Sequence, residues 1–571
     1  MSPLSRLPRH AILPLILLTA SLGLAASGLA QPSATSPSTP VVGSGNTVTA
    51  DPPLPRPRTT PCTVQLFANF QFADFSPKPF TYTPPAACPG PWAKVILSAD
   101  FSITAGRQFD RTAEIALGHT NLYFGTTAEP SGTVARNWHV ERDLTDYSPL
   151  FATGQTGEVN LGNLVNSTFT GILSGSAVLQ FYPVAKHEPA PRTADTVISL
   201  STGTGGTATL ANTSSVLAPT LSLPTNVEAA YLDVIPQSQS GDEFWYTCVL
   251  DDVAGELASC GGTAFREVEV TVDGQPAGVA PVYPWIFTGG IDPLLWRPIP
   301  GVQTLNFQPY RVDLTPFAGV LANGQPHQVG VRIYNANNFF VVAASLLLYQ
   351  DHGASHVTGA VTRNTLSAAP SPVVEENLTT APDGTITGTV TTTSKRQLTI
   401  SGYVNTSHGK VETTVAQSLD FTNRQDFTVS ATRFTQNITQ GTKIDSGTET
   451  RQGGSVALAG KHLSYPLTLD IDFVANADGS GAQTTTYDQK FDSQEARVGK
   501  GIPFVGTVTN HAASVDTLLF DASGSVTGFA NRKSSQDYFS LATDSGCYSR
   551  SITAQDGLLA TVTDGKGCLS H

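Results

Sequence analysis

The stretch ITAGRQFDRTAEIALG, residues 103–118, combines the pattern of a β-strand with an unusual density of charge. Side chains two positions apart lie on the same face of a strand. One face is therefore predicted to pack in a core, and it consists of Phe109, Ala113, Ile115 and Leu117. Arg111 interrupts that face, while Asp110 and Glu114 crowd the other. Such a strand folds only where something accommodates these charges.

The strand pattern recurs through most of the chain. After residue 60, short alternating runs such as RTAEIALGHTNLYFG and TFTGILSGSAVLQFYPV are separated by Gly, Asn, Ser or Pro. Charged residues make up only 13% of the sequence, and Thr, Ser, Gly and Ala replace them. That composition favours strands and turns over helices, so we predict an all-β protein.

A chain of 571 residues is too long for one hydrophobic core. Two strand-rich blocks, 61–190 and 220–352, each contain a D-L-T segment (RDLTDYSPLF and VDLTPFAGVL) followed by a closing apolar strand. This similarity predicts two related, adjacent β-sandwiches, with residues 191–219 as a low-complexity linker. In the second block, Val268, Val270 and Val272 alternate with polar residues before Asp273-Gly274, which predicts a β-hairpin.

Residues 353–571 are Thr-rich and alternate without any helical period. We expect a third β-rich domain, either a long meander or another sandwich, and assign it no chemistry.

The N-terminus is typical of an exported protein. Residues 1–30 resemble a signal peptide, with Arg6 and Arg9 before an apolar run and a predicted cleavage site after Ala30. Residues 31–60 are rich in Pro, Ser and Thr and are predicted to be a disordered linker. No later segment offers 18 consecutive apolar residues, so we expect a secreted or periplasmic protein without membrane contact after cleavage.

Six cysteines permit 15 pairings. Export implies an oxidising compartment, which favours disulfides between neighbours in the sequence: Cys62 with Cys88, Cys248 with Cys260, and Cys547 with Cys568. No Cys or His cluster has metal-ligand spacing, so we expect neither a metal nor a cofactor. A net charge of −13 argues against a nucleic-acid partner.

Carboxylates are the remaining candidates for acid–base chemistry, because the sequence contains no GxSxG, HExxH, P-loop or GxGxxG motif. One cluster is RQFDRTAE, and the second is SGDEFWYTC, where Asp242 and Glu243 precede three aromatic residues. Aromatic rings beside a carboxylate stack on sugars and raise its pKa. The alternative for this cluster is a turn acid before a buried strand. Glu141 and Arg142, in a third segment, form either part of a site or a cross-strand ion pair.

Six segments together resemble the secreted peptide N-glycosidases, most closely the acid-active A type, in the order of that family. They are FDRTAEIALG (109–118), GTTAEP (125–130), ERDLTDYSPLF (141–151), VNLGNLVNSTFTGILS (159–174), SGDEFWYT (240–247) and YPWIFTGGIDPLLWRPI (283–299).

The resemblance implies an amidase that hydrolyses the β-aspartylglucosamine bond of an N-glycoprotein or glycopeptide. Such an enzyme releases the glycan as a glycosylamine and converts Asn to Asp. It also implies two jelly-roll sandwiches side by side, with the site in the cleft between them. Asp110-Arg111 matches the catalytic pair of the first sandwich, and Glu243, or failing that Asp242, matches the acid of the second.

The supporting residues of the family match this sequence less specifically. Glu129 or Glu141, together with Trp138, match the supporting Glu and Trp of the family. Trp245, Trp285 and Trp296 are candidate sugar platforms, with a buried core position as the alternative. Asp110 is expected to activate water, Glu243 to protonate the leaving nitrogen and Arg111 to neutralise the oxyanion. Two other readings stay open: a non-catalytic carbohydrate-binding or adhesive sandwich, and a glycoside hydrolase with paired acids.

Overall fold

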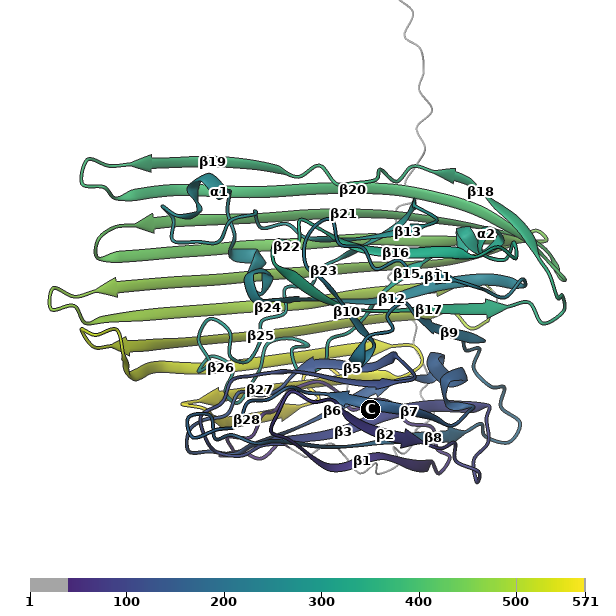
Figure 1. Ribbon diagram of the computed structural model, residues 1–571, viewed down its shortest axis with the longest axis horizontal. Coiled ribbons are helices and arrows are strands. Elements are labelled where there is room, and N and C mark those ends of the chain that lie inside the picture. The colour runs from purple at the N-terminus through teal and green to yellow at the C-terminus, as the bar shows by residue number, and fades with distance from the viewer. Residues whose placement is uncertain (1–39, 500, 569–571) are drawn as a thin grey trace, which may run out of the picture. The chain divides into compact units, whose positions relative to one another are not determined.

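The computed structural model describes residues 40–499 and 501–568 (Figure 1). The chain is 56% strand and 5% helix, which confirms the prediction of an all-β fold. The predicted signal peptide and residues 31–39 of the predicted linker lie outside the described residues. Among the described residues, no helix is long and apolar enough to cross a membrane.

The first sandwich consists of two four-stranded antiparallel sheets that enclose one core. One sheet has the order β1-β8-β3-β6 and the other β2-β7-β4-β5. The strands are β1 (Cys62–Phe72), β2 (Lys78–Tyr82), β3 (Trp92–Ile103), β4 (Thr112–Leu117), β5 (Thr120–Thr126), β6 (Arg136–Asp143), β7 (Gln155–Asn160) and β8 (Leu173–Pro183).

The second sandwich repeats this arrangement, with sheets of order β10-β17-β12-β15 and β11-β16-β13-β14. An extra strand, β9 (Thr196–Ser199), pairs with β17. The other strands are β10 (Thr207–Leu210), β11 (Thr220–Leu221), β12 (Val227–Gln239), β13 (Glu267–Val272), β14 (Gln275–Pro281), β15 (Tyr310–Asp313), β16 (His327–Tyr334) and β17 (Phe339–Gln350). The predicted hairpin at Asp273-Gly274 is confirmed: it joins β13 to β14, and both turn residues have positive φ.

Adding nine to each strand number of the first sandwich gives the strand order of the second, so both have the eight-stranded jelly-roll topology. Because successive strands run in opposite directions, the connections that follow alternate strands gather at the same end of a roll. In the first roll these connections follow β1, β3, β5 and β7. In the second they follow β10, β12, β14 and β16. Each roll therefore presents four loops at one end.

Residues 191–219 are not a linker, so that prediction is wrong. It contributes β9 and β10 to the second roll and the short 3-10 helix η2 (Thr204–Gly206). Thr- and Gly-rich sequence conceals these strands, because they are only four residues long.

The C-terminal region is one antiparallel meander, which decides between the two predicted forms. Its eleven strands have the order β18-β20-β21-β22-β23-β24-β25-β26-β27-β28, and β19 also pairs with β20 (Figure 1). They are β18 (Thr358–Asn364), β19 (Val373–Thr380), β20 (Ile386–Thr406), β21 (Gly409–Val429), β22 (Arg433–Gln452), β23 (Ser455–Ala475), β24 (Gly481–Val498), β25 (Phe504–Phe520), β26 (Val526–Ala542), β27 (Gly546–Gln555) and β28 (Leu558–Asp564).

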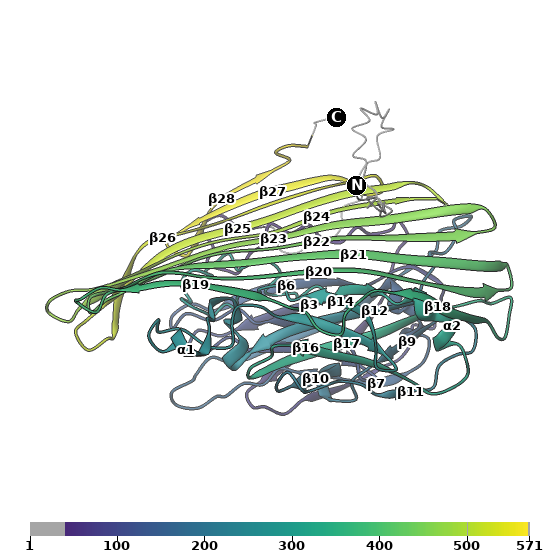
Figure 2. The same cartoon turned by 90° about the horizontal axis from the view of Figure 1, so that it is seen from above.

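The long sheet lies along the second roll and shares its hydrophobic core (Figure 2). Strand alternation places apolar side chains such as Phe421, Ile444 and Leu467 on the face toward the roll. The helices described are small: α1 (Asp251–Ala254), α2 (Ala318–Leu321) and the 3-10 helices η1 (Thr145–Phe151), η3 (Ser240–Asp242), η4 (Trp245–Thr247) and η5 (Thr315–Phe317).

Residues 40–60 have no strand or helix, but the prediction of disorder is wrong for them. Ala50 is fully buried against the C-terminal sheet, and its amide donates to Gln536 Oε1 at 2.7 Å. Farther along, the Leu54 amide donates to Glu141 Oε2 at 2.9 Å. This segment therefore connects the sheet to the first roll. The three predicted disulfides are confirmed at Cys62–Cys88, Cys248–Cys260 and Cys547–Cys568.

Candidate active site

Asp110 and Arg111 lie in the connection from β3 to β4, just before the strand begins at Thr112. The predicted strand is therefore too long at its start. Phe109 is 48% exposed, so its assignment to the core face is wrong. Ala113, Ile115 and Leu117 are buried as predicted.

Glu114 shows why the second face of this strand carries charge. Its side chain is buried and accepts hydrogen bonds from Asn160 Nδ2 at 3.0 Å and Thr207 Oγ1 at 3.2 Å. The segment around Gly205, from the predicted linker, covers it. Burial raises the pKa of Glu114 to about 7. The second roll thus packs over the polar face of β4.

The loops that follow β3 and β5 are joined by backbone pairing. The Arg111 amide donates to Thr127 Oγ1 at 2.8 Å, and the Thr127 amide donates to the Arg111 carbonyl at 2.7 Å. Glu129 follows two residues later. This pairing brings Asp110 and Glu129 to the same place at the end of the first roll.

The second roll contributes the loop between β14 and β15. Thr288 Oγ1 accepts from the Glu129 amide at 2.8 Å and donates to the Thr127 carbonyl at 2.7 Å. The Gly289 backbone hydrogen-bonds to the Asp110 carboxylate. A Cβ at Gly289 would lie 2.2 Å from Glu129 Oε2 and 2.4 Å from Asp110 Oδ1. Only glycine allows both carboxylates to approach this backbone.

Glu243 approaches the same loop from the connection between β12 and β13. A Cβ at Gly290 would lie 3.5 Å from Glu243 Oε1 and 3.1 Å from Phe244. The Gly289-Gly290 backbone thus lies between the acids of the first roll and Glu243. We call Asp110, Glu129 and Glu243 the carboxylate cluster.

Asp110 perturbs the other two acids of the cluster. Burial, followed by the negative charge of Asp110, raises the pKa of Glu243 to about 7 and that of Glu129 to about 7. Burial also raises the pKa of Asp110, while the Gly289 hydrogen bond and the Arg111 charge lower it. Near neutral pH the cluster therefore contains two partly protonated groups, Glu129 and Glu243, beside Asp110, whose ionised form is opposed by burial and favoured by Gly289 and Arg111.

Two arginines border the cluster. Arg111 Nη2 donates to Gln108 Oε1 at 3.0 Å, and its Nε is buried without a partner among the described residues. Arg297 lies 3.4 Å from Glu129 Oε1 and donates to the Pro130 carbonyl at 2.5 Å. Both cations are available to a negative charge that develops at the site.

Asp242 does not belong to the cluster, which corrects its prediction as a site residue. It is fully buried, and its Oδ1 accepts from Arg266 Nη2 at 2.8 Å. Its Oδ2 accepts the amides of Asn337 at 2.9 Å and Asn338 at 2.7 Å. Asp242 therefore fixes the loop that presents Glu243 and is saturated with hydrogen bonds.

Glu141 is also excluded from the cluster. It forms an ion pair with Arg56, lies 3.4 Å from His139, and accepts the Leu54 amide. Despite burial, these partners lower the pKa of Glu141 to about 2. Glu141 lines a cavity of about 820 Å³ between the N-terminal segment, both rolls and the C-terminal sheet, and that lining contains none of the three clustered acids. Its role is to hold the N-terminal segment on β6.

Trp245, Trp285 and Trp296, the candidate sugar platforms, are buried in the core, which was the stated alternative, and Trp138, the candidate supporting residue, is buried as well. Trp138 stacks on Phe101 in the first core, and Trp285 packs 4.5 Å from Phe307. Trp245 packs against Phe421, and Trp296 against Tyr487, both on the C-terminal sheet. Trp296 Nε1 also donates to the Gly290 carbonyl at 2.8 Å, so it supports the glycine loop from behind.

The exposed aromatic side chain next to Asp110 and Arg111 is Phe109. Its ring lies 5.3 Å from that of Phe169, in the loop after β7, and the Arg111 guanidinium lies 5.8 Å from its centre. An accessible ring beside a carboxylate is a surface on which a sugar stacks.

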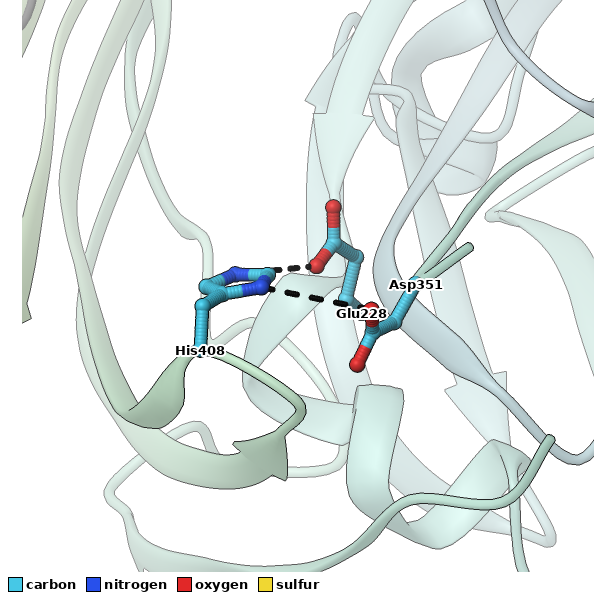
Figure 3. Close-up of side chains that lie close together, drawn as sticks. All are labelled: Glu228, Asp351 and His408. Carbon is cyan, nitrogen blue, oxygen red and sulfur yellow. Dashed lines mark ion pairs between the residues drawn. The ribbon is translucent and has the colours of Figure 1, made fainter. Parts of the chain in front are cut away.

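One group of described side chains has metal-like spacing: Glu228, Asp351 and His408 (Figure 3). It connects the second roll to the turn between β20 and β21. The Asp351 carboxylate already accepts the Ser407 amide at 2.5 Å, Ser407 Oγ at 2.7 Å and the Gly353 amide at 2.9 Å. We interpret this group as an interface contact, and the absence of a metal stays a prediction.

Comparison with known proteins shows the family of this chain. The family model of peptide N-acetyl-beta-D-glucosaminyl asparaginase amidase A matches residues 51–367, and its C-terminal domain matches residues 389–467. This chain belongs to the peptide N-glycosidase A family. Peptide-N4-(N-acetyl-beta-glucosaminyl)asparagine amidase A of Prunus dulcis is 30% identical over 474 residues, which cover 78% of this chain and 81% of the relative.

Solved structures of peptide N-glycosidases also match, at lower similarity. PNGase F of Flavobacterium meningosepticum is 14% identical with a TM-score of 0.34, covering 51% of this chain and 96% of that one. PNGF-II is 12% identical with a TM-score of 0.35, covering 51% of this chain and 66% of that one. These similarities are too weak to transfer residues, so the site of this peptide N-glycosidase rests on its own geometry.

Sequence reasoning missed three residues of the site: Gly289, Gly290 and Arg297. Their signal was present in YPWIFTGGIDPLLWRPI, where a Gly-Gly pair comes two residues before an acid and an arginine follows. Adjacent glycines outside a hairpin turn indicate a close approach of the backbone to other groups.

Proposed function

We propose that the carboxylate cluster hydrolyses the amide bond between asparagine and the first N-acetylglucosamine of an N-glycan. The protein is a peptide N-glycosidase whose substrates are N-glycopeptides or N-glycoproteins. Water adds to the side-chain carbonyl carbon, the C–N bond breaks, and the products are aspartate and a glycosylamine.

Asp110 is the proposed base. Burial raises the pKa of Asp110, which makes the ionised carboxylate a better acceptor for a proton of the attacking water, and the Gly289 hydrogen bond and Arg111 favour that ionised form. Glu243 is the proposed acid. Its pKa near 7 means that it holds a proton at acidic and neutral pH and can deliver it to the departing nitrogen.

Arg111 and Arg297 are proposed to stabilise charge. The unpartnered Nε of Arg111 offers a donor to the oxyanion of the tetrahedral intermediate. Arg297 neutralises Glu129, whose proximity to Asp110 keeps the two carboxyl groups from ionising together at low pH.

One observation carries this proposal: Asp110 and Glu129, from one jelly roll, and Glu243, from the other, lie against the same Gly289-Gly290 backbone. Acids from separate domains that meet at one glycine loop belong to one site and are not unrelated turn residues.

Mass spectrometry of a glycopeptide tests the proposal. Asp110→Asn is expected to fold normally and to lose glycan release by a factor of about 10² to 10⁴. Asp100→Asn, whose side chain is exposed on β3, is the matched control and should keep full activity. Near-normal release by the Asp110→Asn enzyme would remove Asp110 from the mechanism.

The mass of the product peptide separates this reaction from glycoside hydrolysis. An amidase leaves aspartate without any sugar, whereas a glycosidase leaves N-acetylglucosamine on asparagine. A peptide that retains the sugar would contradict the amidase mechanism.

We also propose that the protein is exported. The N-terminal sequence of residues 1–30 and three disulfides support this localisation, because disulfides persist in oxidising compartments. Fractionation of the producing cells tests it, and protein confined to the reducing cytosol would contradict it.

A further inference from the structure

The C-terminal sheet contacts the loop segment that completes the site, here called the active-site segment, residues 288–297. Arg532 Nε donates to the Leu294 carbonyl at 3.0 Å, and its Nη2 donates to the Arg297 carbonyl at 3.2 Å. Ser514 Oγ donates to the Leu295 carbonyl at 2.8 Å. The carbonyls of Leu294, Leu295 and Arg297 are therefore all bound by side chains of one sheet.

A β-bulge aims Arg532 at the segment. Val515 pairs with Lys533 and Thr517 with Ala530, so Asp516 on β25 faces two residues of β26. One of them, Asn531, has a φ of 57°. A bulge re-directs the side chains beside it, and such bulges are frequent next to active sites.

Two acids meet at the same contact. Asp292 of the segment and Asp516 of the sheet are both fully buried, and their carboxyl groups interact with each other. Asp292 Oδ2 and both oxygens of Asp516 have no donor among the described residues. A carboxylate cannot donate, so a hydrogen bond between the two groups requires one proton between them. The charged groups facing the pair are Arg532 from β26 and Arg297 from the segment, while the residue opposite Asp516 on β24 is the uncharged Thr485.

The segment needs such support because it contains strain. Ile291 has a φ of 63°, a left-handed conformation that β-branched residues rarely adopt. It lies between Gly290 and Asp292, directly beside the backbone that contacts the carboxylate cluster. Strain of this kind persists only where surrounding contacts over-determine the conformation.

We propose that Asp516 and Arg532 are positioning residues of the amidase, and that the proton shared by Asp292 and Asp516 makes their hold on the active-site segment depend on pH. The proposal rests on the proposed function, since the segment supplies the Gly289 backbone and Arg297 to the cluster. It also gives residues 353–571 a role in catalysis.

The direction of the pKa shift of Asp516 agrees with a shared proton. Burial, followed by the charge of Asp292, raises the pKa of Asp516 to about 7, while Arg532 opposes the increase. Below that pH the pair holds its proton and the bond is intact. Above it both groups ionise, repel each other and release the segment.

Hydrogen exchange of a peptide spanning the active-site segment tests this without reference to activity. In the wild-type protein, protection corrected for intrinsic rates should decrease by about tenfold or more between pH 5.5 and 8.5. Asp516→Asn supplies a permanent amide donor and should abolish that decrease, as should Asp292→Asn if the first variant does not fold. Asp537→Asn, exposed on β26, should behave as wild type. Equal pH dependence in wild type and the Asp516→Asn or Asp292→Asn variant would overturn the proposed proton.

Kinetics test the positioning role of Arg532. Arg532→Met should lower kcat by about tenfold to a hundredfold with little change in KM and remove protection of the segment at every pH, because a displacement of about 1 Å suffices for such a loss. Arg532→Lys should recover part of both. Lys533→Met, on the opposite face of the same strand, is the control. Unchanged segment exchange in Arg532→Met would overturn the positioning role, whatever the fate of the amidase assignment.

Discussion

The two jelly rolls share one strand order but use equivalent loops differently. In the first roll the connection after β3 is short and carries Asp110, and that after β5 carries Glu129. In the second roll the connection after β12 carries Glu243, and that after β14 carries Gly289 and Arg297. The site is therefore built from corresponding loops of two similar domains, each of which supplies an acid.

The difference lies in how each loop is held. The Asp110 loop is fixed by hydrogen bonds to its neighbouring loops: two with Thr127 after β5, and others that join Gln108 and Arg107 to the loop after β7. The Glu243 loop is fixed by the buried Asp242–Arg266 pair, the amides of the loop after β16 and the Cys248–Cys260 disulfide. A long loop needs this internal framework to present one side chain with the accuracy of a short one.

The sharpest test of this comparison separates two adjacent acids in the second roll. Glu243→Gln should lower kcat by about 10²- to 10⁴-fold and leave stability nearly unchanged, because only the proton donor is lost. Asp242→Asn should instead destabilise the protein by about 3 kcal/mol, because it leaves Arg266 as an uncompensated buried charge.

Kinetics and denaturant unfolding of both variants measure the contrast. Glu256→Gln, exposed in the same connection, is the matched control and should change neither property. If Asp242→Asn lost kcat and kept stability while Glu243→Gln did the reverse, the two roles would have to be exchanged.

The glycines of the equivalent loops offer a second test. Gly289→Ala should reduce kcat by about 10²-fold, since its Cβ would displace the carboxylates of Asp110 and Glu129. Gly132→Ala, in the corresponding loop of the first roll, meets no atom within 4 Å and should be neutral. Steady-state kinetics on both variants decide the matter. Equal activity would mean that the acids are not held against this backbone.

The sequence predicted the fold class, the two sandwiches, the hairpin and the disulfide pairs because those depend on local patterns. It also predicted that Asp110 and Glu243 belong together, although that prediction came from the family resemblance. Burial on both sides of β4 was not predictable, since Glu114 is covered by a segment whose sequence resembles a linker.

The errors at Trp245 and Trp296 have one physical cause. Trp245 and Trp296 are core residues because the C-terminal sheet contributes Phe421 and Tyr487 to pack against them. The sequence identified that sheet as β-rich but gave no information about the face it covers. Without knowing which residues cover an aromatic side chain, the sequence cannot distinguish a sugar-binding ring from a core residue.

Both rolls bury carboxyl groups with raised pKa values, which predicts an acid-stable protein. Glu114, Glu129 and Glu243 shift from 4.5 to about 7, so the folded state binds more protons than the unfolded chain between those values. Stability is then greatest near pH 4.5 and decreases by a few kcal/mol as the pH increases through 7.

Thermal unfolding at pH 5 and pH 8 measures this effect, with a lower Tm expected at pH 8. Glu114→Gln removes one titrating group outside the carboxylate cluster and should weaken the pH dependence of Tm. A Tm that is higher at pH 8 would contradict the raised values.

The smallest expected effect concerns substrate contact at the end of the first roll. Phe109 is exposed beside Asp110, whereas the tryptophans of the second roll are buried. Phe109→Ala should increase KM about fivefold and leave kcat nearly unchanged, because a stacked ring contributes about 1 kcal/mol to sugar binding. Leu541→Ala, 49% exposed on β26, is the control for loss of an accessible apolar side chain. If KM stays constant in Phe109→Ala and increases in Trp245→Phe, the sugar contacts the second roll after all, and the buried position of Trp245 must open during binding.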